Sequence, residues 1–259
     1  MTSEARSYRP PKDISDNTAD DDRRRLLEQH IIHEFDEATA ISNLFGCYGA
    51  IQRRRYSSFL RLIVGKRVLD AGCGLGLLSK VCLDAGYSVV SIDIDEKSLQ
   101  LAQRLYSIPC QRGNVYHTHL QNGAIDTTLL FDVIEHLDLV PLALELKRLG
   151  TRRVIVYDSN TSNPLLRWYR RRRNHLEHAE HSPTDVVAAF TAAGFRLREQ
   201  RYLDTIALPV SGGLQYRAVP VLGHFPNVLL AVDRVLSSAL GLIRLDRTLT
   251  FRYLLVLDR

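Results

Sequence analysis

One glycine-rich segment constrains the fold of this chain more than any other feature. Its residues are Val68-Leu69-Asp70-Ala71-Gly72-Cys73-Gly74-Leu75-Gly76, and we name residues 70–76 the glycine loop. A short apolar run precedes the loop, and a helical pattern follows it. Glycines at such a junction let the backbone approach a ligand, and the first turn of a helix offers N–H groups without intrahelical partners. The segment therefore predicts a strand, a loop that cradles a ligand, and a helix.

Strand and helix patterns alternate along the rest of the chain. Segments whose apolar residues recur at helical spacing, such as residues 96–106, lie between short apolar runs. Ser182-Pro183 is typical of the start of a further helix. Parallel strands need crossover connections of this kind. The alternation therefore predicts a Rossmann-like α/β fold in which helices cover both faces of a parallel sheet. We expect strands at residues 67–70, 88–93, 108–111, 126–131, 154–157, 195–203 and 250–257.

The two flanks of the alternating region predict the domain organisation. Residues 1–22 are polar and show no apolar period, which is typical of a disordered tail. Apolar residues at helical spacing over 23–66 predict N-terminal helices that form a cap. The α/β domain is expected over 67–259, with an insertion at 209–248 that contains an apolar helix over about 227–243.

The spacing of the glycines separates this loop from one that binds a dinucleotide. A dinucleotide site has the pattern G-x-G-x-x-G, whereas here Leu77 stands at the third glycine position and Gly76 comes one residue earlier. Asp70 ends the first expected strand and Asp93 ends the second, so two carboxylates are expected beside the loop. Carboxylates repel phosphates and attract cations. We therefore expect a cofactor with a sulfonium and an ammonium group, S-adenosylmethionine.

Four motifs resemble class I S-adenosylmethionine-dependent methyltransferases, especially the branch that includes the ubiquinone-biosynthesis O-methyltransferases. The motifs follow one another in the order of that family, and the resemblance is close from Val68 to about Leu149. It implies a seven-stranded, mostly parallel sheet with a reversed last strand. The motifs are Val68 to Gly76, the acid Asp93, Gly113-Asn114, and Ile125-Asp126 through Phe131 to Leu137.

The resemblance also implies which residues bind the methionine part of the cofactor. Gly72, Gly74 and Gly76 are expected to pack under it. Phe131, at the end of the fourth strand, is expected to offer its backbone carbonyl to the methionine ammonium. Asp70 is expected either to contact the cofactor directly or to anchor the loop.

A second group of residues is expected to bind the nucleoside part. Asp93 would accept hydrogen bonds from the ribose hydroxyls, with Ile94 beside it. The Asn114 side chain and the Val115 amide would meet the adenine amino group. Asn114 departs from the family, which commonly has Asp at this position, but its side-chain oxygen can accept the same hydrogen bond.

Glu135-His136 follows the fourth expected strand, at the sheet edge where α/β folds place their chemistry. Histidine is the commonest general base near neutral pH, so His136 is a candidate catalytic residue. The alternative is that His136 bonds the backbone or packs beneath the cofactor. A base is required only where the acceptor has a high pKa of its own, because methyl transfer needs chiefly in-line geometry and a deprotonated nucleophile.

Composition excludes several other classes of protein. The 34 Lys and Arg residues exceed the 29 Asp and Glu residues by little, so charge alone does not indicate a nucleic-acid partner. The four cysteines form no C-x-x-C pair, which argues against a disulfide framework or a zinc knuckle. His175, His178 and His181 are spaced by three, but glutamates interleave them and no cysteine is near, so no metal site is expected. No long apolar run and no hydrophobic leader are present, and we expect a cytoplasmic location.

Two later segments concern the methyl acceptor. Residues 167–173, Arg-Trp-Tyr followed by four arginines, suit phosphate, RNA or an anionic membrane surface, or form a solvated helix face. The apolar helix over 227–243 is more apolar than a surface helix requires, and we expect a lid over an apolar substrate; packed core and contact with a membrane are the alternatives.

The expected function is methyl transfer from S-adenosylmethionine to a small or lipid-like acceptor, with oxygen as the favoured acceptor atom. One alternative is an RNA or protein methyltransferase that uses the basic segment 167–173. No Asn-Pro-Pro-aromatic loop follows the fourth strand, which makes nucleic acid the less favoured partner. Another alternative is a scaffold that binds the cofactor without turnover. Peripheral contact with an anionic membrane and the oligomeric state are left open.

Overall fold

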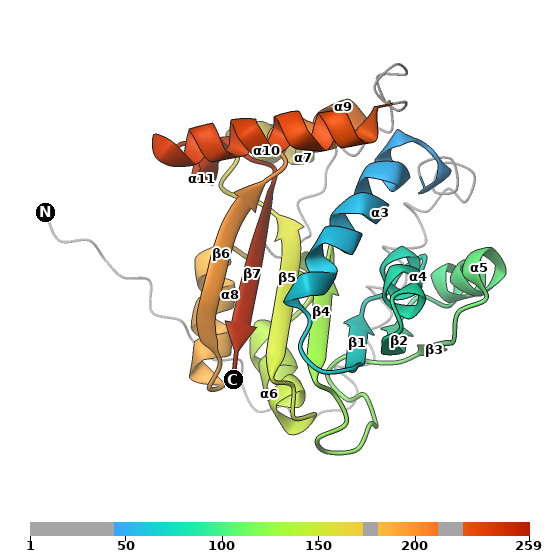
Figure 1. The fold of residues 1–259 in the computed structure, drawn as a ribbon. Coiled ribbons are helices and arrows are strands. Elements are labelled where there is room, and N and C mark those ends of the chain that lie inside the picture. The colour runs from blue at the N-terminus through green and yellow to red at the C-terminus, as the bar shows by residue number, and fades with distance from the viewer. Residues whose placement is uncertain (1–43, 173–180, 212–224) are drawn as a thin grey trace, which may run out of the picture. The chain divides into compact units, whose positions relative to one another are not determined.

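A seven-stranded sheet lies at the centre of the structure (Figure 1). The computed structural model describes residues 44–172, 181–211 and 225–259. The chain divides into units 1–35 and 36–259, and all described residues belong to the second unit. The strand order is β3-β2-β1-β4-β5-β7-β6; β7 is antiparallel to both neighbours, and the other pairings are parallel. This topology confirms the expected Rossmann-like fold with a reversed last strand.

Several sequence predictions lie outside the described residues. They are the tail over 1–22, the cap over 23–43, the end of the basic segment at Arg173, and the histidines His175 and His178. The part of the expected insertion over 212–224 also lies outside them.

The strands form close to where the apolar runs predict them. Each expected strand agrees with the observed one to within two residues at either end. All five residues of β4 are buried, because helices cover both faces of the sheet and a parallel strand between them meets no solvent. The strands are β1 (Arg67–Ala71), β2 (Ser88–Asp93), β3 (Cys110–Arg112), β4 (Thr127–Phe131), β5 (Arg153–Ser159), β6 (Arg196–Leu203) and β7 (Arg252–Asp258).

Side-chain caps explain where two of the helices begin. Ser182 and Asp185 form a reciprocal capping box at the start of α8, which confirms the helix start predicted at Ser182. Asp95 accepts hydrogen bonds from the Lys97 and Ser98 amides and so caps α5. The helices are α3 (Cys47–Phe59), η1 (Leu60–Leu62), α4 (Leu77–Asp84), α5 (Glu96–Tyr106), η2 (Ile134–His136), α6 (Leu139–Arg148), α7 (Pro164–Arg172), α8 (Pro183–Ala192), α9 (Ala207–Ser211), α10 (Pro226–Leu242) and α11 (Asp246–Leu249).

Two hydrophobic cores cover the two faces of the sheet. Neighbouring residues of a strand point to opposite faces, so Leu130 packs in one core while Leu129 and Phe131 pack in the other. Helices α6 and α8 contribute to the core around Leu130, and α3 and α4 to the core around Phe131. Within the described parts of the chain, no helix is long and apolar enough to span a membrane.

Aromatic side chains fix α3 on its face of the sheet. The ring of Tyr56 lies 5.3 Å from that of Phe131, and the ring of Phe59 lies 5.4 Å from that of Tyr157, centroid to centroid. Both pairs adopt edge-to-face geometry, which aromatic rings favour. The helix therefore packs directly against the ends of β4 and β5.

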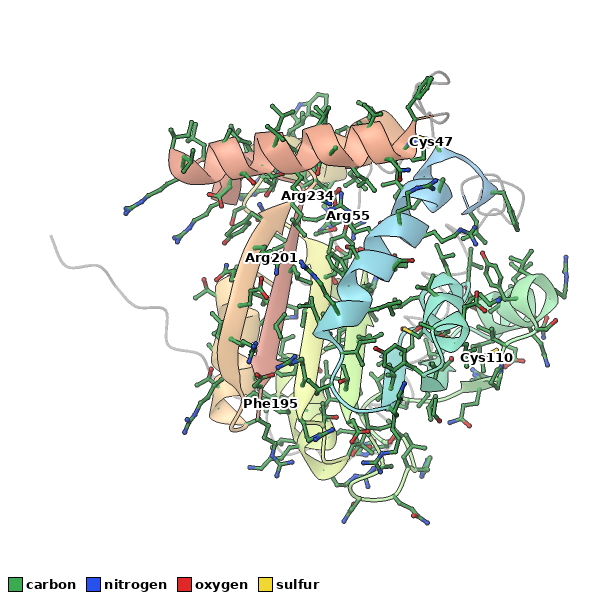
Figure 2. The ribbon with its side chains drawn as sticks, viewed as in Figure 1. Cys47, Arg55, Cys110, Phe195, Arg201 and Arg234 are labelled. Atoms are coloured by element: carbon green, nitrogen blue, oxygen red, sulfur yellow. The ribbon has the colours of Figure 1, made fainter. Side chains whose placement is uncertain are left out.

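Buried Arg55 joins α3 to two other parts of the chain (Figure 2). Its guanidinium forms an ion pair with Asp204, after β6, and lies 3.4 Å from Oδ2 of Asp233 on α10. Asp204 also accepts a hydrogen bond from the Tyr157 hydroxyl. The other oxygen of Asp233 accepts hydrogen bonds from the amides of Ile206 and Ala207 at 2.8 and 2.9 Å. Both carboxylates therefore have several partners in the interior.

Replacing Arg55 should destabilise the fold strongly. We expect Arg55→Ala to lower the free energy of unfolding by about 3–5 kcal/mol, because it leaves two buried carboxylates without their cation. Urea denaturation followed by circular dichroism measures this loss. Arg61→Ala is the control, because Arg61 is exposed. Equal losses in the two variants would contradict the expectation.

Candidate functional site

The residues expected to bind the cofactor follow four neighbouring strands. Phe131 ends β4, the glycine loop follows β1, Asp93 ends β2, and Asn114 follows β3. The strand order β3-β2-β1-β4 places these positions side by side, because parallel strands end at the same edge of a sheet. Motifs that are far apart along the chain therefore meet at one edge.

Two glycines of the loop have to be glycine for steric reasons. Gly72 has a φ of 79°, and a Cβ there would lie 2.4 Å from Cγ2 of Val133. Gly76 has a φ of 78°, and its Cβ would lie 2.4 Å from Cδ1 of Ile108. Gly74 differs, because nothing lies within 4 Å of the Cβ position there. The loop is thus packed tightly at both ends and open at Gly74, where a ligand can approach the backbone.

Asp93 holds the open part of the loop. Its Oδ2 accepts a hydrogen bond from the Gly74 amide at 2.7 Å, and its Oδ1 accepts one from the Asp95 amide at 3.0 Å. Burial raises the pKa of the Asp93 carboxyl, while the backbone donors oppose this shift. Each carboxylate oxygen keeps lone-pair capacity for a further donor. The position fits a carboxylate that binds ribose hydroxyls, and that role remains a prediction.

Asp70 has a different environment from Asp93. It is buried, and its Oδ2 accepts a hydrogen bond of 2.5 Å from the Ser79 hydroxyl of α4, which also lies 2.7 Å from the Ser91 hydroxyl. Burial raises the pKa of Asp70 to about 7. Asp70 therefore anchors the helix that follows the glycine loop, and direct contact with a cofactor remains a prediction.

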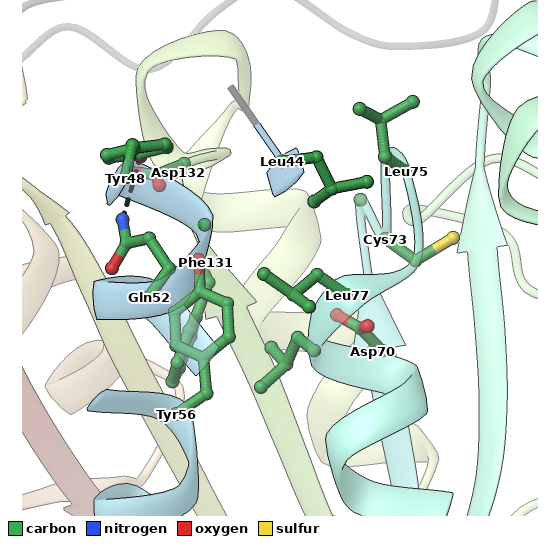
Figure 3. Close-up of a pocket in the computed structure, with 14 residues that line it drawn as sticks. Leu44, Tyr48, Gln52, Tyr56, Asp70, Cys73, Leu75, Leu77, Phe131 and Asp132 are labelled. Atoms are coloured by element: carbon green, nitrogen blue, oxygen red, sulfur yellow. Dashed lines mark hydrogen bonds between the residues drawn. The ribbon is translucent and has the colours of Figure 1, made fainter. Parts of the chain in front are cut away.

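A pocket of about 310 Å³ opens between the glycine loop, the end of β4 and α3 (Figure 3). Of the residues expected to bind the cofactor, Asp70, Gly72, Gly74 and Phe131 line it. Gly76, Asp93, Ile94, Asn114 and Val115 do not line the pocket, although Asp93 is bonded to the loop.

Helix α3 supplies pocket residues that the sequence analysis did not name. Tyr48, Gln52 and Tyr56 face the pocket, and the Gln52 amide donates to the Tyr48 hydroxyl at 2.7 Å (Figure 3). Their spacing of four residues places them on one face of the helix. That periodicity of amide and phenol groups is the signal that could have identified them.

The turn after β4 is held by the neighbouring strands. Asp132 lines the pocket with a φ of 55° and forms an ion pair with the buried Arg252 of β7. Asp158 of β5 accepts hydrogen bonds from the amides of Val133 and Ile134 at 3.0 and 2.8 Å. Burial raises the pKa of Asp158 to about 7. These contacts fix where Phe131 ends the strand.

The residues expected to meet adenine adjoin Asp93. The Gly113 amide donates to the Asp93 carbonyl at 2.9 Å, and Ile94 accepts a hydrogen bond at its carbonyl from Nε of Arg112. The Asn114 side-chain oxygen accepts from the Tyr116 amide at 2.9 Å, so it stabilises the turn after β3. Val115 is buried. A role of Asn114 and Val115 in binding adenine stays a prediction.

His136 lies in η2 and follows the pocket residues Phe131 and Asp132 closely along the chain. It does not itself line the pocket. Its Nε2 is 3.8 Å from one oxygen of Glu135, whose other oxygen pairs with Arg170 of α7. A catalytic role of His136 stays a prediction. No cluster of three or more potential metal ligands occurs among the described residues.

Comparison with protein families identifies the central part of the chain. Residues 69–157, from β1 to β5, match a family described as a methyltransferase domain. This stretch of the chain is similar to methyltransferase domains. The match agrees with the methyltransferase family expected from the sequence motifs.

Two relatives match the chain over different lengths. A ubiquinone biosynthesis O-methyltransferase of Aromatoleum aromaticum is 33% identical over 78 residues, which cover 30% of this chain and 33% of the relative. A probable S-adenosylmethionine-dependent methyltransferase of Mycolicibacterium smegmatis is 26% identical over 168 residues, 58% of this chain and 65% of the relative. The chain thus matches between a third and two thirds of the length of these relatives.

A solved structure shares the fold over a longer range. Geranyl diphosphate C-methyltransferase from Streptomyces coelicolor, in complex with Mg²⁺, geranyl diphosphate and S-adenosyl-L-homocysteine, superposes with a TM-score of 0.60. The superposition covers 82% of this chain and 79% of that protein, at 18% identity. The methyltransferase fold therefore includes elements outside residues 69–157.

The environment of Asp70 predicts how stability depends on pH. Burial raises the pKa of Asp70 from 3.8 to about 7, so the folded state keeps a proton that the unfolded state releases between these values. Stability is then lost as the pH rises from about 4 to 7. We therefore expect the free energy of unfolding of Asp70→Asn, relative to that of the wild type, to be higher at about pH 7.5 than at about pH 4.5. Urea denaturation at the two pH values measures this difference.

The control for this measurement is Asp84→Asn on the same helix, because the Asp84 carboxylate is exposed. Its difference from the wild type should change little over the same range. A difference between Asp70→Asn and the wild type that is independent of pH would refute the assignment.

Proposed function

We propose that this chain transfers the methyl group of S-adenosylmethionine to a small or lipid-like acceptor. The observation that carries the proposal is the bond between Asp93 and the Gly74 amide, at the open point of the glycine loop. It joins the expected ribose site to the expected methionine site at one edge of a methyltransferase fold.

The charge of the pocket fits the proposed cofactor. The described residues that line it include the carboxyl groups of Asp70 and Asp132 but neither a lysine nor an arginine, so the lining offers no cation to a phosphate. Such a lining favours a cation over a phosphate. The sulfonium and ammonium groups of S-adenosylmethionine meet this requirement, whereas the pyrophosphate of a dinucleotide does not.

The roles of the residues follow from their places. The backbone at Gly72 and Gly74 would support the methionine part, and the Phe131 carbonyl would accept from its ammonium. When bound, S-adenosylmethionine supplies an electrophilic methyl group. Because Tyr48 and Gln52 of α3 face the same pocket, we assign them to the wall that orients the acceptor. Catalysis would then rest mainly on positioning two reactants in line.

The relatives support the class of acceptor. The Aromatoleum aromaticum relative carries the name of a ubiquinone biosynthesis O-methyltransferase, and the Streptomyces coelicolor structure contains geranyl diphosphate. The first favours oxygen as the acceptor atom, and both suggest isoprenoid-like acceptors. His136 would act as a base only if the acceptor hydroxyl is protonated at the working pH.

Removing Asp93 should weaken cofactor binding. We expect Asp93→Ala to lower the affinity for S-adenosylmethionine at least about tenfold, because it removes a charged acceptor of ribose hydroxyls and a bond to the loop. Isothermal titration calorimetry measures the affinity. Asp84→Ala, which removes an exposed acid of α4, is the matched control. An unchanged affinity in Asp93→Ala would remove this residue from the site.

The acceptor class can be tested with methyl-labelled S-adenosylmethionine. The full chain is incubated with a cell extract that is then separated into lipid extract, small metabolites, RNA and protein. We expect label in the lipid or metabolite fraction, and much less with Asp93→Ala. Label confined to RNA or protein would favour the alternative based on residues 167–173. Cofactor binding without label in any fraction would indicate a scaffold.

A further inference from the structure

Helix α10 exposes an apolar face. Nine of the fifteen large hydrophobic side chains exposed in the described residues lie between Phe225 and Leu249. The exposed fraction reaches 68% for Val235 and 88% for Leu242. Spacings of three and four residues place most of these side chains on one side of the helix. We name as the α10 surface the residues Val228, Val232, Val235, Leu236, Leu242 and Ile243.

The opposite side of α10 is firmly packed. Leu229, Asp233 and Ser237 are buried there, and Asp233 accepts hydrogen bonds from two amides at the start of α9. The Ser237 hydroxyl lies 2.8 Å from that of Thr205. The α10 surface is therefore exposed on a helix that is already anchored to the domain. Apolar side chains gathered in this way mark a site of contact with another apolar phase.

The charges beside the α10 surface have one sign. The exposed charged residues described on α7, α10, α11 and the turn before α11 are all arginines. Of the acids on these elements, Asp233 is buried and Asp246 is half-buried. Helix α7 also exposes Trp168, by 49%. The arginines are Arg167, Arg171, Arg244 and Arg247, and also Arg234, which lies beside Asp233 and Ser237 on the packed side of α10.

These elements lie near the edge of the sheet that carries the pocket. Figure 1 shows α10 crossing the sheet at the edge where β4, β5 and β6 end. Its first turn contacts α3 through a hydrogen bond of 2.6 Å from Arg54 to Asn227. The start of α7 contacts the end of α11, because the Asn163 side chain donates to the Thr250 carbonyl at 3.0 Å. Helix α3 also lines the pocket, so α10 and the pocket share a neighbour.

We propose that the α10 surface binds the surface of an anionic lipid bilayer. The apolar side chains would enter the boundary between headgroups and acyl chains, and Arg167, Arg171, Arg244 and Arg247 would contact lipid phosphates. Trp168 suits the same interface, because its ring is apolar and its N–H is polar. This inference concerns lipid binding, and it stands independently of methyl transfer.

The arginines favour a membrane over a second copy of this chain as the occupant. In a symmetric dimer the same surface would face itself, so the two sets of arginines would approach one another. No exposed acid described on these helices would compensate them. An anionic bilayer instead offers the opposite charge together with an apolar interior.

The test is co-sedimentation of the full chain with vesicles. One vesicle type contains phosphatidylcholine alone, and the other contains about one third phosphatidylglycerol, an anionic lipid. We expect the wild type to partition at least about tenfold more strongly to the anionic vesicles, and added salt to weaken the binding.

Matched variants separate the α10 surface from general effects of charge. Val235→Glu with Leu242→Glu should lower binding at least about tenfold, because it places carboxylates in the apolar face. Val140→Glu with Leu144→Glu is the control, because it introduces the same charges at exposed apolar positions of α6. Arg167→Gln with Arg171→Gln should weaken binding to anionic vesicles, whereas Arg196→Gln with Arg198→Gln on β6 should not. Thermal unfolding by circular dichroism verifies that each variant folds.

Three results would overturn the proposal. The wild type could remain in the supernatant with both vesicle types. The α10 and α6 double variants could lose binding equally. Analytical ultracentrifugation could show a dimer that Val235→Glu with Leu242→Glu dissociates, in a protein that binds no vesicle. None of these results depends on turnover, so they leave the methyl-transfer proposal to its own test.

Discussion

The buried guanidinium of Arg55 is the constraint on which the arrangement of the domain depends. It lies on α3 and pairs with Asp204 after β6 and with Asp233 on α10. Since α3 forms one wall of the pocket and α10 presents the apolar surface, one cation joins the two regions for which functions are proposed. Removing either acid would leave a charge in a medium that solvates charges poorly. A substitution at Arg55, Asp204 or Asp233 therefore affects residues that are far away along the chain.

The fold and part of the pocket lining could be predicted from the sequence, because their signals are local. The alternation of apolar runs and helical spacing predicts the strands, and the glycine loop with Asp93 predicts where a cofactor would bind. The pocket wall on α3 could not be predicted, because Tyr48 and Gln52 line the pocket only through the packing of the helix on the sheet. The ion pair of Asp132 with Arg252 joins residues far apart along the chain, and neither position has a local signal.

The two acids beside the glycine loop differ in burial and in their hydrogen-bond partners. Asp93 is half-buried and bonded to backbone amides, so a ligand can still reach its oxygens. Asp70 is buried against the Ser79 hydroxyl and secures the following helix. Position at a strand end does not determine burial, so the sequence leaves both roles open for Asp70. Their hydrogen-bond partners distinguish the environments of the two acids.

The place of β7 in the sheet has a consequence for how the chain assembles. β7 lies between β5 and β6, so in the described sheet β6 has no strand partner other than β7. From Ser159 to Arg252 the growing chain leaves the edge of β5 unpaired, with its N–H and C=O groups open to other strands. The segment that carries α10 is part of the loop that must close before the sheet is complete. Insertions in that segment thus lengthen the interval during which an aggregation-prone edge is exposed.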